Sequence, residues 1–115
     1  MYTNLSNEAQ FILGNTGHLK RRESTFYGYL WQFMFDNGFG ISIVKNTIPC
    51  DRYKDLWEIA VIDKNGDLCY DTPITDTVIG NLTEKEVLDY AKQISRLSKT
   101  DCLLFAYRQK YKLYD

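Results

Sequence analysis

Residues 56–70 carry the signals of a β-hairpin, and no other segment restricts the fold of this chain so strongly. Residues 56–63 are rich in β-branched and aromatic side chains, which is typical of a strand. Asn65 and Gly66 follow, and this dipeptide readily supplies the two positive φ angles of a type I′ turn. We therefore expect an antiparallel hairpin in which residues 67–70 form the returning strand.

A helix is predicted to begin shortly after this hairpin. Thr83 and Glu86 have the spacing of a capping box, in which the hydroxyl accepts from one backbone N–H and the carboxylate accepts from another. Apolar residues then recur at helical spacing, and acidic residues precede basic ones, as the helix dipole prefers. The face that we expect to be buried consists of Val87, Tyr90, Ala91, Ile94 and Leu97.

An alternating aromatic segment over residues 26–35 predicts a second pair of strands. Period-two alternation is typical of a strand with two different faces, and a turn at residues 36–38 leads to an expected partner strand at residues 39–45. The aromatic face has two interpretations: it packs under the helix as core, or it stays uncovered and binds a partner. Its members are Tyr27, Tyr29, Trp31, Phe33 and Phe35.

The two ends of the chain are specified less strongly. Residues 4–13 have the pattern of a short helix capped by Ser6, and residues 14–24 have that of a polar, basic loop. This change of composition suggests residues 1–25 as an appendage to a core at residues 26–98. Residues 101–114 fit a helix capped by Asp101 or an extra strand, and the late lysines favour the helix.

Together these segments predict an α+β fold in a single domain, residues 1–115. We expect an antiparallel sheet of about four strands with one long helix packed on it. A short N-terminal helix and a C-terminal helix or extra strand complete this prediction. A chain of 115 residues is too short for two ordinary cores, and its 44 % hydrophobic residues supply material for one.

Composition argues against membrane and disulfide-rich classes. No apolar run approaches the roughly 18 residues of a membrane helix, and the start of the chain lacks the features of a signal peptide. The three cysteines stand at wide spacings, which fits reduced thiols better than disulfides or a zinc site. We therefore expect a cytoplasmic protein that does not contact a membrane.

No arrangement of residues indicates catalysis, a metal site or a cofactor. His18 is the only histidine and falls in the expected polar loop. The Asp-x-Asn-x-Asp pattern at residues 63–67 resembles the start of a calcium loop, but the glycine and the bidentate glutamate that such a loop needs are missing. Asp71 and Asp76 fit side-chain-to-backbone turns better than paired acid–base chemistry. We expect no enzyme activity.

Charges are segregated along the chain although the net charge is only −1. Carboxylates dominate residues 63–89, and basic residues dominate from residue 92 onward. An acidic surface could imitate the phosphates of nucleic acid and occupy a basic channel of another protein. The acidic residues that we expect to bind such a partner are Asp63, Asp67, Asp71, Asp76 and Glu84.

Part of the chain resembles a family of small bacteriophage proteins of unassigned function. The resemblance is carried by residues 55–61, by the run Leu-Cys-Tyr-Asp-Thr-Pro-Ile-Thr-Asp at 68–76, and by residues 78–83. It implies a phage origin and action in the host cytoplasm. With the small size and the segregated charge, it suggests an inhibitor of a host defence system, of the anti-CRISPR or another anti-defence kind, that binds a nucleic-acid-handling or defence protein.

Two other functions also fit the sequence. A single-stranded nucleic-acid-binding protein would stack bases on aromatic side chains beside basic ones. The residues expected to do so are Lys20, Arg21, Arg22, Tyr27, Tyr29, Trp31, Arg108, Lys110 and Lys112. A virion or assembly component would instead form a homo-oligomer through the aromatic face.

Overall fold

The computed structural model describes residues 4–25, 28–46, 56–69, 72–74 and 78–111, which form an α+β fold. Within these ranges a five-stranded sheet has the order β1-β2-β3-β4-β5, and all neighbouring strands are antiparallel. The predicted fold class is confirmed, and the sheet has five strands where about four were expected. The elements are α1 (Asn7–Thr16), β1 (His18–Thr25), β2 (Gly28–Met34), β3 (Phe39–Asn46), β4 (Trp57–Asp63), β5 (Ile79–Leu82), α2 (Glu84–Ser95) and α3 (Lys99–Tyr111).

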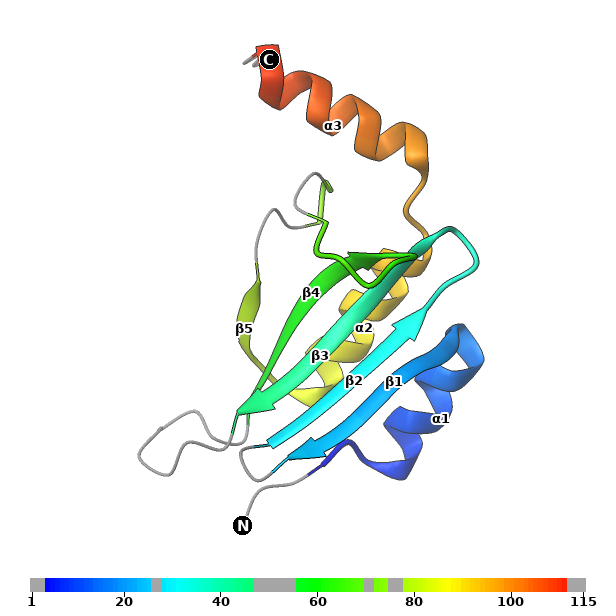
Figure 1. The fold of residues 1–115 in the computed structure, drawn as a ribbon, viewed down its shortest axis with the longest axis vertical. Coiled ribbons are helices and arrows are strands. Elements are labelled where there is room, and N and C mark those ends of the chain that lie inside the picture. Colours follow the sequence, from blue (N-terminus) through cyan, green and yellow to red (C-terminus); the bar gives the residue numbers. More distant parts are fainter. Residues whose placement is uncertain (1–3, 26–27, 47–55, 70–71, 75–77, 112–115) are drawn as a thin grey trace.

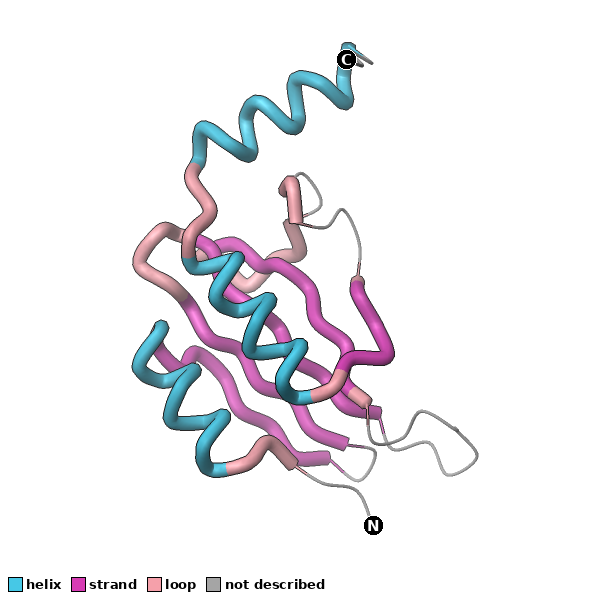
Figure 2. Tube along the Cα trace, turned by 180° about the vertical axis from the view of Figure 1, so that it is seen from behind, coloured by secondary structure: helices cyan, strands magenta, loops and turns pink. Residues whose placement is uncertain are grey.

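The sheet is covered on one face. Figure 2 shows α1 and α2 lying side by side across that face, and Figure 1 views the opposite face, which no helix crosses. Strand register aligns the apolar side chains under the helices, because Trp31 pairs with Ile43 and Ile43 pairs with Ile59. The core therefore lies between one face of the sheet and the two helices.

The aromatic strand belongs to this core. Trp31, Phe33 and Phe35 are each at most 4 % exposed, and Tyr29 is half-buried against them. The indole N–H of Trp31 donates to the side-chain oxygen of Asn4 at 2.8 Å, so the one polar atom of this ring is satisfied. The interpretation of the described aromatics as core is confirmed, and the interpretation as an uncovered face is wrong. Tyr27 lies outside the described residues.

The N-terminal segment is part of the same core. Ser6 caps α1 as predicted, with its hydroxyl accepting from the N–H of Ala9 at 3.1 Å. Leu5, Ala9 and Leu13 join the buried cluster beneath the helices. The described part of residues 1–25 is therefore not an appendage to the sheet.

The predicted basic loop is instead the edge strand β1. Helix α1 continues through Gly14 to Thr16, and β1 follows after Gly17, where an added Cβ would lie 2.4 Å from the carbonyl oxygen of Met34. β1 carries a bulge between Leu19 and Arg21, and it pairs with β2 alone. Charged side chains and bulges are common on edge strands because they discourage pairing with other chains. The strand was missed because it lacks apolar alternation.

The turn after β4 also differs from the prediction. Among the described residues, Asn81 is the only non-glycine with a positive φ, so Asn65 does not adopt the type I′ conformation. Gly66 has φ +85°, and the side chain of Asp63 accepts from the N–H groups of Asn65 and Asp67 at 2.8 and 3.0 Å. The Asp63 carboxylate, which bonds within its own turn, explains why this longer turn is preferred.

The expected returning strand is reduced to one bridge. Ile62 pairs with Leu68, and the N–H of Cys69 donates to the carbonyl of Val61 at 2.8 Å. Tyr70 lies outside the described residues. The neighbour of β4 in the sheet is instead β5, which was not predicted, and Trp57 pairs there with Leu82.

Helix α2 follows the prediction closely. Both hydrogen bonds of the capping box between Thr83 and Glu86 are present. The predicted face is buried at Val87, Ala91, Ile94 and Leu97 and half-buried at Tyr90. The C-terminal segment is a helix, as favoured, although Ser98 rather than Asp101 caps it: the Ser98 hydroxyl accepts from the N–H of Asp101 at 3.0 Å.

Candidate functional site

Helix α3 extends away from the rest of the molecule. Only three residues separate it from α2, and Figure 1 shows it beyond the end of the sheet, along the longest of the 46 × 31 × 23 Å dimensions. Asn37, in the turn between β2 and β3, fixes the start of this extension. Its amide donates at 2.7 Å to the carbonyl of Ile94, in the last turn of α2, and at 2.9 Å to the carbonyl of Leu97, just after that helix. The Ile94 carbonyl also accepts from the backbone N–H of Leu97 at 3.1 Å.

One side of α3 presents large apolar side chains to solvent. Leu103, Leu104 and Tyr107 are 71, 57 and 54 % exposed. Residues three and four apart are neighbours on a helix surface, so Tyr107 lies next to both leucines. Cys102 is half-buried and is the described residue of α3 that packs against the core. We call Leu103, Leu104 and Tyr107 the α3 face.

A fourth exposed apolar residue lies at the same end of the molecule. Leu68 is 44 % exposed and pairs with Ile62 near the end of β4. This end of β4 adjoins the turn that holds α2, because Asp63 pairs with Phe39, two residues after Asn37. A large side chain has an accessible surface of about 150 Å². Multiplied by the exposed fractions of the α3 face and Leu68, this gives roughly 350 Å² of exposed surface in total.

An exposed apolar area of this size is informative about binding. The largest apolar patch on a monomeric protein is typically about 300–600 Å² and is often functional. A specific interface buries about 800 Å² on each partner, of which roughly 60 % is apolar. A partner that covered both the α3 face and Leu68 would bury most of the apolar area that one specific interface requires.

The three described acidic residues among those predicted to bind a partner do not form a single surface. Asp63 and Asp67 lie together in the turn after β4, but Glu84 lies beyond the opposite end of that strand, because Trp57 pairs with Leu82. At 3.3 Å per residue, β4 separates these two places by roughly 20 Å. Asp71 and Asp76 lie outside the described residues.

The turn with Asp63 and Asp67 is also not purely acidic. Lys64 is part of it, and the ammonium of Lys20 approaches the carbonyl oxygen of Lys64 at 3.4 Å. Neighbouring positive charges reduce the negative potential that Asp63 and Asp67 could present to a basic channel. The described acidic residues therefore give little support to the hypothesis that this chain imitates nucleic acid.

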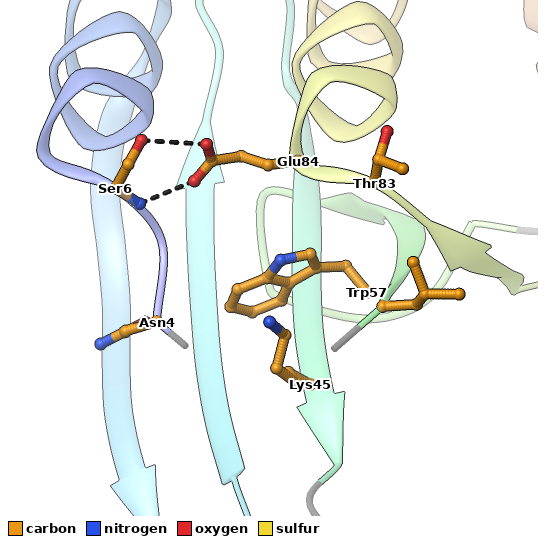
Figure 3. A pocket seen from close by; sticks show the side chains of 7 residues that line it. Asn4, Ser6, Lys45, Trp57, Thr83 and Glu84 are labelled. Carbon is orange, nitrogen blue, oxygen red and sulfur yellow. Dashed lines mark hydrogen bonds between the residues drawn. The ribbon is translucent and has the colours of Figure 1, made fainter. Parts of the chain in front are cut away.

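Glu84 instead joins the two helices that cover the sheet. Its carboxylate accepts from the backbone N–H of Ser6 at 2.6 Å and from the Ser6 hydroxyl at 3.0 Å, as the dashed lines in Figure 3 show. These residues are 78 positions apart in the chain. A carboxylate at the first turn of a helix is favoured by the helix dipole, and Glu84 contacts the first turns of both α1 and α2.

A cavity of about 250 Å³ lies beside this contact. Lys45 extends along it with its ammonium 4.3 Å from the centre of the Trp57 ring, and both side chains are 2 % exposed (Figure 3). A cation over an aromatic ring is stabilised electrostatically, and the effect increases when both groups are removed from water. The residues lining the cavity are Asn4, Ser6, Lys45, Leu56, Trp57, Thr83 and Glu84.

Sequence reasoning did not identify this cavity. Ser6 and Thr83 were recognised as helix caps, but nothing local indicates that the two helix starts lie side by side. Lys45 falls on the buried face of β3 by alternation with Ile41 and Ile43, and this alternation is the one signal that could have marked it. The contact of Lys45 with Trp57 joins two different strands, β3 and β4, so the local sequence does not predict it.

The described basic and aromatic residues among those expected to bind nucleic acid do not form an exposed stacking surface. Trp31 is 2 % exposed, and the guanidinium of Arg22 lies over its ring at 4.6 Å from the centre. Arg21 pairs with Glu23 at 2.6 Å, and Lys20 reaches the turn after β4. Tyr27 and Lys112, together with the side chains of Arg108 and Lys110, lie outside the described residues.

The described residues contain neither a metal site nor a membrane-spanning helix. No three His, Cys, Asp or Glu side chains among them are grouped so that they could hold a metal ion, and the contact of His18 with Asp36 at 3.3 Å is highly exposed. No helix of the described part is long and apolar enough to span a membrane.

The comparisons with known proteins contribute no identification. No family model, no curated protein and no solved structure matches this chain.

Proposed function

We propose that this chain is a phage-encoded binding protein that inhibits a host defence system by binding a host protein in the host cytoplasm. The observation that carries the proposal is the α3 face, with Leu103, Leu104 and Tyr107 more than half exposed on a helix that extends from the sheet. The phage origin rests on the resemblance of residues 68–76 and 78–83 to small bacteriophage proteins.

Energetics support a role for the α3 face in binding. Burial of a leucine side chain stabilises a protein by about 1.5–3 kcal/mol. Because Leu103 and Leu104 are mostly exposed, much of this stabilisation is missing in the free chain. A partner that covers the face would recover it on association. Helices that bind an apolar groove of another protein commonly use apolar anchors three and four residues apart, which is the spacing of Tyr107 from Leu104 and from Leu103.

The acidic residues have a secondary place in this proposal. Asp63 and Asp67 lie at the same end of the molecule as α3, so a partner bound there could contact both groups. Charged residues at the rim of an interface mainly affect the association rate and its salt dependence. Reversal of both aspartates should therefore weaken binding less than truncation of the α3 face.

The proposal is tested by affinity purification of the tagged chain from host extract, with and without nuclease. Three forms are compared: the wild type, Leu103→Ser with Leu104→Ser, and Phe11→Ser. Phe11 is a matched control because it is 72 % exposed on α1, away from α3. We expect a stoichiometric host protein that survives nuclease, is retained by the Phe11→Ser variant and is lost from the double variant.

Other outcomes would contradict the proposal in different ways. Retention of nucleic acid alone, lost after nuclease treatment, would favour the nucleic-acid-binding function. If the double variant retained the host protein as well as the wild type does, the inhibitor function would still stand, but the binding surface would not be α3. A wild type that binds no host protein, and sediments as a dimer that the double variant abolishes, would favour a homo-oligomer formed through the α3 face.

A further inference from the structure

We draw no further inference here: the strongest candidate, the cavity between the first turns of α1 and α2, rests on two helix N-termini and on Lys45 and Glu84 side chains that already have contacts within the protein, and nothing in the structure indicates what would fill it.

Discussion

Helices α2 and α3 follow each other in the chain and have similar lengths, 12 and 13 residues, yet they differ in how much apolar surface they bury. In α2, Val87 and Ile94 are fully buried against the sheet, whereas in α3 Leu103, Leu104 and Tyr107 remain more than half exposed. Both helices have a hydroxyl at their N-cap, so capping does not explain the difference. We infer that α2 holds the fold together and that α3 is available for binding.

The largest expected effect is a difference in stability between two variants, each with one apolar residue truncated, one in α2 and one in α3. Ile94→Ala should lower the free energy of unfolding by about 2–5 kcal/mol, because it removes fully buried methyl groups and leaves a cavity. Leu103→Ala should change it by about 0.5 kcal/mol or less, because the side chain is 71 % exposed. Denaturant unfolding of both variants measures the contrast. Similar losses in the two variants would show that α3 belongs to the core.

A smaller effect is expected at the junction of the two helices. Asn37→Ala removes the donor to the carbonyls of Ile94 and Leu97 and should cost about 1–3 kcal/mol, because two part-buried hydrogen bonds are lost. Asn65→Ala is the matched control, since the Asn65 side chain is exposed in a turn. Denaturant unfolding compares the two. Equal stabilities would mean that the Asn37 contact does not secure the end of α2.

The smallest effect concerns the pH dependence of α2. The backbone N–H of Thr83 and then its hydroxyl donate to Glu86, and these bonds hold the pKa of the Glu86 carboxyl below its ordinary value. A lowered pKa in the folded state gives stability that is present above the ordinary pKa of glutamate and is lost as the pH falls through the folded pKa.

Glu86→Gln should therefore flatten the dependence of stability on pH in the acidic range, with little change in the dependence at neutral pH. Unfolding measured between about pH 3 and 7 reports this difference, and Glu8→Gln, on the first turn of α1, serves as the control. If the free energy of unfolding changed with pH in the acidic range as steeply in the Glu86→Gln variant as in the wild type, a stabilising role of this carboxylate would be contradicted.

The elements predicted correctly from the sequence are those whose signals are local. The capping box of Thr83 and Glu86 and the apolar spacing through Leu97 specify α2 within one stretch of chain. The hydroxyl of Ser6 specifies the start of α1 in the same way. Strand β2 was recognised by its alternation, but its burial was decided by the helices α1 and α2, which lie across that face of the sheet.

The errors arise where distant contacts or edge positions decide the structure. Strand β1 carries charged residues because it lies at the edge of the sheet, so its sequence resembles a loop. The contact between Ser6 and Glu84 joins residues 78 positions apart, and no local pattern predicts it. Glu84 was grouped with Asp63 by proximity in the sequence, and the pairing of β4 with β5 separates them.

Hydrogen exchange of the chain, alone and bound to the host protein that it retains, tests most directly whether α3 is a binding element. We predict that backbone amides in Glu84–Ser95 are protected in both states, whereas those in Lys99–Tyr111 exchange fast in the free chain and become protected on binding. Protection of α3 equal to that of α2 in the free chain, or exchange in α3 that binding leaves unchanged, would contradict this account.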